Sequence, residues 1–189
     1  MAELGFLAKL VVNSRLTWLF HRFFGVSRLL DLVKLEPERI IEVGCGVGIT
    51  TSFIAAKFKK AEVAALDLES QISAANKLKV KDERVKFVAG DATSLNFDSC
   101  SFDAAFEIFT FHHIPDYEAA IAEICRVLKK GGKFYIMDAA IKSFPLHRLV
   151  FFEPVHFTKD DFVRILQKRG FRINQSFGRV FFKIEAEKV

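Results

Sequence analysis

The chain has 189 residues, of which 51% are hydrophobic and 27% are charged, and it carries a formal net charge of +5. This length and hydrophobic content are typical of one globular domain with a sizeable core, and they exclude a disordered chain. The charge is mildly basic, but Lys and Arg are dispersed, so it gives little support to a nucleic-acid-binding protein. An anionic membrane surface or an acidic substrate fits this charge equally well.

Cysteine usage and hydropathy bear on the cellular compartment. The cysteines are odd in number and lack the spacing of a metal site, at Cys45, Cys100 and Cys125. This pattern predicts a reducing compartment and no metal centre. No apolar run reaches the length of a membrane span, and Lys9 and Arg15 interrupt the apolar stretch that a signal peptide would need. We therefore expect a cytoplasmic protein.

The first 35 residues predict one or two helices. Apolar residues recur there at helical spacing, and Lys and Arg interleave with them. The simplest interpretation of residues 1–35 is a helical cap or lid packed on the domain. The alternative is a basic, aromatic amphipathic segment over residues 3–30 that rests on a membrane or covers a hydrophobic substrate pocket.

A strand, a glycine-rich turn and a helix follow at residues 39–60. The β-branched run at residues 39–43 suits a strand that is buried on both faces. Three glycines then stand at alternate positions, Gly44, Gly46 and Gly48. A helical pattern continues from residue 50 to residue 60. Because glycine has no Cβ, such a turn allows the backbone to touch a ligand, although a simple tight turn would have the same composition.

The second strand, residues 62–67, ends in Asp67, which lies 19 residues after Gly48. A nucleotide site in an α/β sheet needs a carboxylate here, because its two oxygens accept both ribose hydroxyls. The alternative is that Asp67 caps the helical stretch that begins at Ser70, predicted over residues 71–78. The next residue, Leu68, is placed to cover one face of an adenine ring.

The third and fourth strands, residues 84–89 and 102–107, are each followed by a turn. The tripeptide Gly-Asp-Ala at residues 90–92 closes the third strand. Taken alone it is weak evidence, because Asp is common in turns. Residues 107–113 form the loop after the fourth strand, at the carboxyl edge where open α/β sheets bind ligands.

The C-terminal half predicts two more helices and three more strands. The expected elements are a helix at 117–130, a strand at 133–138, an irregular stretch at 139–157, a helix at 160–168 and strands at 170–173 and 180–185. Two glycines stop the first of these helices, and Thr158 with Asp161 caps the second. The last two strands suggest an antiparallel hairpin, which is not expected at the end of a nicotinamide-binding Rossmann domain.

Taken together, the motifs resemble class I S-adenosylmethionine (SAM) dependent methyltransferases, among them the ubiquinone and menaquinone biosynthesis enzymes. The E-x-G-x-G-x-G at residues 42–48 resembles their motif I, whereas a dinucleotide turn would need a glycine at Ile49. The R-V-L-K-K-G-G at residues 126–132 is characteristic of the family. The resemblance runs from Arg39 to the C-terminus. It implies an α/β, Rossmann-like fold over residues 36–189, with a seven-stranded, mostly parallel sheet, an antiparallel last strand, helices on both faces and an N-terminal helical cap.

The resemblance also implies SAM as the cofactor and S-adenosylhomocysteine as the product. Glu42 would meet the amino end of the methionine part, directly or through water, and Asp91 and Ala92 would read the adenine. The backbone of Glu107 and Ile108 would flank the methionine part. The full expected cofactor set is Glu42, Gly44, Cys45, Gly46, Gly48, Asp67, Leu68, Asp91, Ala92, Glu107 and Ile108. We interpret Cys45 as a small spacer, since nothing nearby would activate its thiol.

Methyl transfer from a sulfonium is an in-line displacement, in which the protein holds the acceptor in a dry pocket. A general base is needed only where the acceptor must lose a proton early. His112 is the favoured catalytic residue by its position in the family pattern, with helix capping as its alternative. Glu107 competes with it, unless it holds the methionine amino group instead. The expected acceptor-binding residues are His113, His147, Phe151 and His156.

We expect a small acceptor that is apolar, lipid-like or quinone-like, because phenylalanine is abundant near the N-terminus and in residues 144–157. The alternatives are a nucleic-acid methyltransferase, a non-catalytic SAM-binding partner subunit and a nicotinamide oxidoreductase. No Asn/Asp-Pro-Pro-Tyr/Phe tetrapeptide follows the fourth strand, which disfavours the first alternative. The intact cofactor motifs disfavour the second. Oligomeric state and membrane contact stay open.

Overall fold

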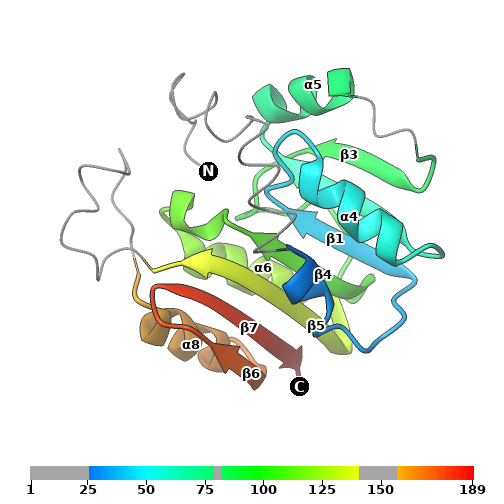
Figure 1. Cartoon of the computed structure of the whole chain (residues 1–189). Coiled ribbons are helices and arrows are strands. Elements are labelled where there is room, and N and C mark those ends of the chain that lie inside the picture. The colour runs from blue at the N-terminus through cyan, green and yellow to red at the C-terminus, as the bar shows by residue number, and fades with distance from the viewer. Residues whose placement is uncertain (1–25, 79–81, 141–156) are drawn as a thin grey trace.

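The computed structural model describes residues 26–78, 82–140 and 157–189. Its centre is a seven-stranded sheet with the strand order β3-β2-β1-β4-β5-β7-β6 (Figure 1). Strands β1 to β5 pair in parallel, and β7 runs antiparallel to both of its neighbours. The strands are β1 (Arg39–Val43), β2 (Glu62–Asp67), β3 (Val85–Ala89), β4 (Phe102–Ile108), β5 (Leu128–Ala139), β6 (Phe171–Phe177) and β7 (Phe181–Lys188). The expected sheet is confirmed, including its antiparallel last strand.

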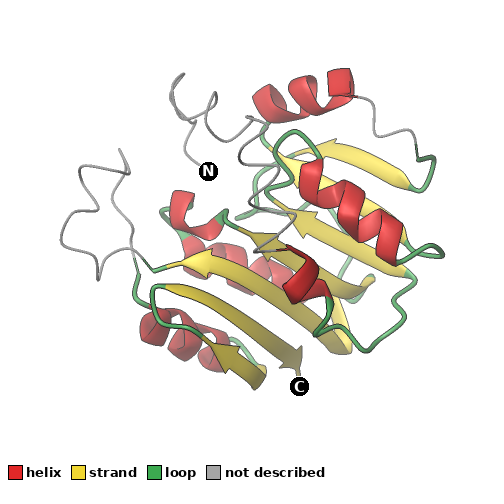
Figure 2. Cartoon of the chain, in the orientation of Figure 1, coloured by secondary structure: helices red, strands yellow, loops and turns green. Residues whose placement is uncertain are grey.

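Helices cover both faces of the sheet (Figures 1 and 2). They are α3 (Val26–Leu30), α4 (Ile49–Lys57), α5 (Glu69–Leu78), α6 (Tyr117–Val127) and α8 (Lys159–Lys168), with a single 3-10 turn, η2 (Phe111–His113). Helices α3, α4 and α5 lie on one face, and α6 and α8 lie on the other. Because every parallel strand is followed by a helix or a turn at the same edge, the ligand-binding loops gather at the carboxyl ends of the strands.

The central strand β1 is apolar on both faces because both faces are covered. Ile40 packs with Leu29 of α3 and Ile54 of α4. The next residue, Ile41, points to the opposite face and packs with Ile121 of α6. Successive side chains of a strand alternate between faces, so a strand in the middle of a three-layer domain needs apolar residues at consecutive positions.

Several of the phenylalanines fill the core between α8 and the sheet. Phe162 of α8 lies 4.9 Å from Phe157 and 5.8 Å from Phe182 of β7, measured between ring centroids. Phe111 of η2 meets the same ring edge-on at 5.5 Å. These rings are fully buried, so part of the phenylalanine content serves packing and says nothing about the acceptor.

The boundary between α6 and β5 differs from the prediction. The helix ends at Val127, and the backbone of Leu128 is already extended, so the Lys-Lys-Gly-Gly stretch expected to end the helix lies within β5. The pairing jumps from Leu128 opposite Phe102 to Lys133 opposite Ala104. The extra residues therefore form an irregularity in β5. The backbone freedom of glycine suits such an irregularity as well as it suits the end of a helix.

Helix α4 also ends earlier than predicted, at Lys57 instead of residue 60. The guanidinium of Arg84 lies across its C-terminus and donates to the carbonyl oxygens of Phe58 at 2.7 Å and Ala55 at 3.2 Å. These carbonyls have no partner within the helix, and a cation there also suits the helix dipole. The Arg84 side chain, which is distant in sequence, thus caps the C-terminus of α4.

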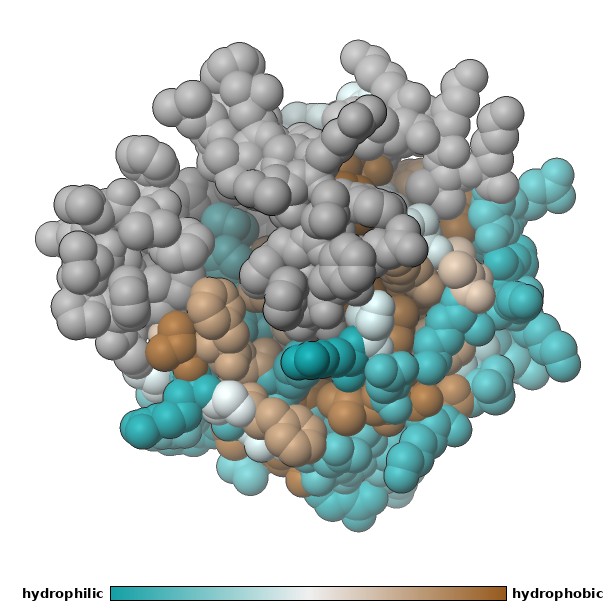
Figure 3. Space-filling view, in the orientation of Figure 1, coloured by the Kyte–Doolittle hydropathy of each residue, from teal (hydrophilic) through white to brown (hydrophobic). Residues whose placement is uncertain are grey.

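Of the expected N-terminal cap, residues 1–35, the structure describes only residues 26–35. Within this part, α3 buries Val26, Leu29 and Leu30 against the sheet and α4. The remainder of the expected cap lies outside the described residues. Among the helices that the structure describes, none is long and apolar enough to cross a membrane. Figure 3 shows hydrophilic residues over much of the face beside α4 and more hydrophobic ones towards β5 and β7.

Candidate cofactor and acceptor site

The tips of β1, β2 and β3 meet at the carboxyl edge of the sheet. The backbone N–H groups of Gly44 and Cys45 donate to the carbonyl oxygen of Leu66 at 2.8 and 3.1 Å. The N–H of Gly90 donates to the carbonyl oxygen of Asp67 at 2.9 Å. Three stretches that are far apart in the sequence are therefore joined by direct hydrogen bonds. They lie beside the change of strand order at β1 and β4, where open α/β sheets bind their ligands.

The glycine turn is closed on one side and open on the other. Gly44, Gly46 and Gly48 all have positive φ, at 80°, 53° and 86°. A Cβ on Gly44 would lie 2.0 Å from the side-chain oxygen of Thr110, whereas a Cβ on Gly46 would meet no described atom within 4 Å. Cys45 between them is buried, and burial raises the pKa of its thiol, so it acts as a spacer and not as a nucleophile. The turn can therefore receive a ligand over Gly46.

Glu42 lies under the glycine turn and is fully buried. Its carboxylate accepts hydrogen bonds from the hydroxyls of Thr50 and Thr51 in the first turn of α4, the latter at 2.5 Å. Burial raises the pKa of this carboxyl to about 7. Both carboxylate oxygens are thus engaged within the protein. The two threonines were not anticipated, although they open the helix eight and nine residues after the acid.

Asp67 is the last residue of β2 and lies beside the glycine turn. One carboxylate oxygen accepts the N–H of Gly46 at 2.7 Å and the other accepts the N–H of Leu68 at 2.7 Å. Burial raises the pKa of this carboxyl, and the two N–H donors oppose that shift. Each carboxylate oxygen can accept two hydrogen bonds, so each keeps capacity for one more donor. Asp67 therefore both holds the glycine turn and retains acceptors for a ligand.

Asp91 and Ala92 follow β3 at the same edge. One carboxylate oxygen of Asp91 accepts both the N–H and the hydroxyl of Thr93 at 2.9 Å, so the acid is held in a local turn. The side chain of Ala92 is fully buried in the core. The structure therefore places both residues next to the tips of β1 and β2, through the Gly90 hydrogen bond.

Glu107 is the last but one residue of β4 and is fully buried. One of its oxygens accepts the N–H groups of Thr110 at 2.6 Å and Phe111 at 3.3 Å, and Oε2 accepts from no donor among the described residues. Burial and the nearby charge of Asp138 raise the pKa of Glu107 well above its usual range. The carbonyl of Ile108 accepts the Thr110 hydroxyl at 3.3 Å. The side chain of Glu107 thus organises the loop that carries His112.

The second acid at this edge, Asp138 of β5, was not among the predicted site residues. Its carboxylate accepts the ring Nδ1–H of His112 at 2.5 Å, the backbone N–H of His112 at 3.0 Å and that of Ala139 at 2.7 Å. The His113 ring lies 3.9 Å from the His112 ring, between centroids. Burial lowers the pKa of His113 to about 4. An acid at or next to the last residue of a strand was the available signal, since β2 and β4 carry one in the same place.

A family model described as "Methyltransferase domain" matches residues 41–136 of this sequence, about half of the chain. The chain belongs to the methyltransferase domain family. The matched residues run from β1 to β5 and contain the glycine turn, Asp67, Asp91, Glu107 and His112. The resemblance stated from the motifs is therefore confirmed at the level of the family.

The curated relatives of this methyltransferase domain include enzymes named for apolar substrates. The fatty-acid O-methyltransferase of Mycolicibacterium smegmatis is 35% identical over 105 residues, 56% of this chain and 38% of that protein. The demethylmenaquinone methyltransferase of Clavibacter sepedonicus is 35% identical over 128 residues, 67% of this chain and 51% of that protein. The chain thus spans about half the length of these relatives or less.

The fold also matches solved structures. The crystal structure of a SAM dependent methyltransferase from Aquifex aeolicus superposes with a TM-score of 0.79 at 19% sequence identity, covering 99% of this chain and 100% of that one. At this low identity the likeness concerns the fold alone.

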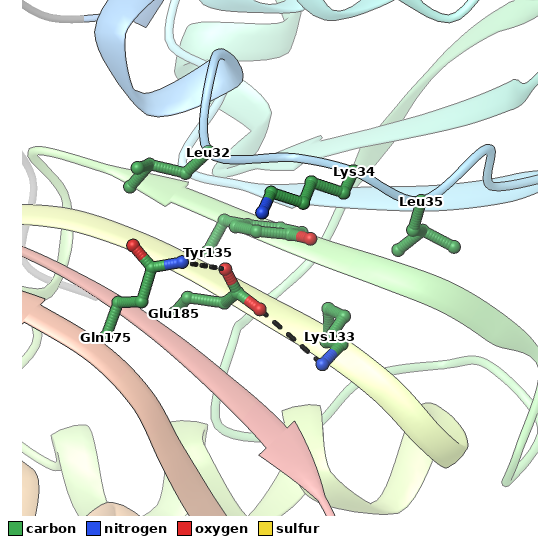
Figure 4. Close-up of a pocket in the computed structure, with 7 residues that line it drawn as sticks. All are labelled: Leu32, Lys34, Leu35, Lys133, Tyr135, Gln175 and Glu185. Carbon is green, nitrogen blue, oxygen red and sulfur yellow. Dashed lines mark hydrogen bonds and ion pairs between the residues drawn. The ribbon is translucent and has the colours of Figure 1, made fainter.

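A separate hollow of about 350 Å³ lies on the α3 face of the methyltransferase domain (Figure 4). It is lined by Leu32, Lys34, Leu35, Lys133, Tyr135, Gln175 and Glu185. Two of its charged groups pair with each other, since Glu185 lies 3.5 Å from Lys133, and Glu185 also accepts from Gln175 at 3.4 Å. Lys133 lies six residues before the carboxyl end of β5, so this hollow is well removed from the strand tips.

Three predicted acceptor-binding residues, His147, Phe151 and His156, lie outside the described part of the methyltransferase domain. Their place near the acceptor stays a prediction. His113, the fourth, lies in η2 at the carboxyl edge, beside His112. Among residues 26–78, 82–140 and 157–189, no three His, Cys, Asp or Glu side chains form a group that could hold a metal ion.

Proposed function

We propose that this chain is a SAM-dependent methyltransferase that acts on a small, apolar acceptor. Membership of the methyltransferase domain family supports the reaction class. Because one fold hosts many functions, the argument rests on the site. The observation that carries it is the junction of three strand tips around an open glycine turn, with the Asp67 carboxylate beside it.

The residues present fit the cofactor in two respects. The backbone over Gly46 is open, so an extended ligand could lie against it. Asp67 retains one acceptor position on each oxygen, which suits a pair of ribose hydroxyls. When bound, SAM supplies the activated methyl group; this chain binds it, orients the acceptor and excludes water.

In this proposal, Glu42 supports the site from below. Its carboxylate is held by Thr50 and Thr51, so it ties the glycine turn to the start of α4. Asp91 is fixed by Thr93 beside the same tips and would read the adenine amino group. The contact between Glu42 and the methionine part, if it forms, would run through a water molecule or through one of the threonines.

An apolar acceptor is favoured by the carboxyl edge beside the histidines. Phe181 of β7 is 59% exposed and stands opposite Ala139, the last residue of β5. Its ring meets that of Phe109, next to the end of β4, at 6.3 Å edge-on. Aromatic surface at this edge would attract an apolar molecule, and the names of the two relatives point to the same chemical class.

The test is transfer of a labelled methyl group from SAM by the full chain. The acceptors would be a long-chain fatty acid, a demethylated quinol, a polar metabolite and a transfer RNA. We expect transfer to one of the two apolar acceptors only. Transfer to the polar metabolite would contradict the acceptor class. Salt-sensitive transfer to RNA would instead indicate a nucleic-acid methyltransferase, and SAM binding without any transfer would favour a non-catalytic subunit.

A further inference from the structure

His112 is held at two points by one side chain of the neighbouring strand. Asp138 accepts the ring Nδ1–H at 2.5 Å with one oxygen and the His112 backbone N–H at 3.0 Å with the other. A two-point attachment fixes both the position of the residue and the plane of its ring. A carboxylate that accepts from Nδ1 also sets the tautomer, because Nε2 of the neutral ring then carries the lone pair.

The charged groups around His112 come from three elements. Asp138 of β5 and Glu107 of β4 lie beneath it, and His113 of η2 packs against its ring. Burial and the Asp138 charge favour the neutral, protonated form of Glu107. His113, with a pKa of about 4, is neutral at neutral pH. Of the two buried carboxyls, Asp138 is the one that accepts hydrogen bonds from His112.

The pair lies next to the proposed cofactor crevice. His112 belongs to the turn directly after β4, and β4 lies between β1 and β5. The hydroxyl of Thr110, two residues earlier, donates to the carbonyl oxygen of Gly44 in the glycine turn at 3.3 Å. The side chain of His112 is 10% exposed, so most of the ring is shielded from solvent while part of it reaches the surface. A base at this place could act on an acceptor bound beside the crevice.

We propose that Asp138 is a positioning residue that prepares His112 as a general base, and that the acceptor is a hydroxyl compound such as a phenol, an enol or an alcohol. This inference rests on the proposed function. A carboxylate acceptor is already ionised near neutral pH and needs no base, whereas a hydroxyl does. The fixed pair of His112 and Asp138 has a purpose only in the second case.

In the proposed methyl transfer, one bond to the methyl carbon forms and one breaks. The acceptor hydroxyl gives its proton to Nε2 of His112, and an oxygen lone pair forms the new bond to the methyl carbon. The carbon–sulfur bond breaks, and its electron pair goes to sulfur, which loses its positive charge. The charge gained by the His112 ring is stabilised by the Asp138 carboxylate at 2.5 Å. The proton leaves to solvent afterwards.

The first test reads the His112 tautomer in the full chain saturated with S-adenosylhomocysteine, by nitrogen-15 NMR of the histidine rings. The ring signals of His112 would be identified as those that are missing from the spectrum of His112→Gln. We expect a proton on Nδ1 and none on Nε2 at pH 8. In Asp138→Asn one amide oxygen faces three N–H donors, the His112 ring, the His112 backbone and the Ala139 backbone, so the ring proton should move to Nε2. A wild-type ring that carries its proton on Nε2 would overturn the inference.

The second test compares 4-octylphenol with octanoate, two apolar acceptors that react through a phenolic hydroxyl and through a carboxylate. We expect methyl transfer to octylphenol with an acid limb in the pH profile of kcat. Asp138→Asn should lower that kcat by ~10²–10⁴-fold and leave the melting shift with S-adenosylhomocysteine unchanged. Transfer to octanoate alone, or to neither compound, would overturn the hydroxyl assignment. An absent melting shift in the wild type would instead contradict the proposed function itself.

Discussion

At the residue scale, the buried carboxyl of Glu42 should make stability depend on pH. Its pKa is raised from 4.5 to about 7 in the folded state, so the folded protein binds an extra proton between these values. The free energy of unfolding should then fall as pH rises from 4.5 to 7, by about 3 kcal/mol from this group. Urea unfolding of the wild type and Glu42→Gln at pH 5 and pH 8 measures the effect.

Gln is the matched substitution because it is neutral at every pH and can still bond to both threonines. Other buried carboxyls such as Glu107 titrate in the wild type as well. The relevant quantity is therefore the difference between the two pH slopes. We expect a flatter slope for Glu42→Gln, and parallel slopes would contradict the proposed state of Glu42.

Gly44 and Gly46 form a matched pair for testing the glycine turn. Both have positive φ, but only at Gly44 would a Cβ clash, at 2.0 Å from Thr110 Oγ1. Gly44→Ala should combine backbone strain with the overlap and cost about 2–5 kcal/mol of unfolding free energy. Gly46→Ala should cost about 1 kcal/mol but weaken S-adenosylhomocysteine binding.

Chemical unfolding and calorimetric titration of the two variants separate the effects. Equal losses of stability would mean that Thr110 moves aside at little cost. An unchanged affinity in Gly46→Ala would mean that the ligand does not approach this part of the backbone.

Some residues of the site could be predicted from their position in the sequence alone. Asp67 is the last residue of β2 and Glu107 is the last but one of β4, so sequence position alone places them at the carboxyl edge. The bonds that Glu42 makes to Thr50 and Thr51 were not predictable, because they depend on how α4 sits on β1. Asp138 was recognised as the end of a strand, but its contact with His112 follows from the pairing of β4 with β5.

At the element scale, Arg126 joins α6 to the loop before β4. Its guanidinium donates to the carbonyl oxygens of Leu95 and Phe97, both at 2.8 Å, and pairs with Glu123. This gives the Arg of the R-V-L-K-K-G-G motif a structural role. Arg126→Met should lower the free energy of unfolding by about 1–2 kcal/mol, because the loop loses its donors and water only partly replaces them.

The control is Arg164→Met in α8, which removes an exposed Arg that only approaches Asp161 at 3.4 Å. A surface pair of this kind contributes about 0–0.5 kcal/mol. Denaturant unfolding of both variants gives the comparison. Similar small losses in the two would show that the Arg126 hydrogen bonds are replaced by water without cost.

The same motif shows why the boundaries of elements were harder to predict than their existence. A helical pattern followed by two glycines predicts a helix stop, and α6 was expected to reach residue 130. The structure instead ends it at Val127, because Leu128 pairs with Phe102 and enters the sheet. Strand pairing is a tertiary interaction between distant residues, so no local pattern reports it.

At the scale of the whole molecule, the fold class and the order of elements followed from the alternation of strands and helices and from the family resemblance. The sheet order and the closing hairpin agree with that expectation. Three strand tips meet as the motifs required, through the hydrogen bonds to Leu66 and Asp67. The helical cap expected over residues 1–35 and the acceptor-binding stretch expected over 139–157 stay predictions, since residues 1–25 and 141–156 lie outside the described part of the chain.

The most direct test is calorimetric titration of the full chain with S-adenosylhomocysteine and, separately, with NAD⁺. We predict that S-adenosylhomocysteine binds with one molecule per chain and that NAD⁺ does not bind. Asp67→Ala should weaken the binding at least tenfold without loss of fold, since it removes the proposed ribose acceptors. Binding of NAD⁺ in place of S-adenosylhomocysteine, or an unchanged affinity in Asp67→Ala, would contradict the account.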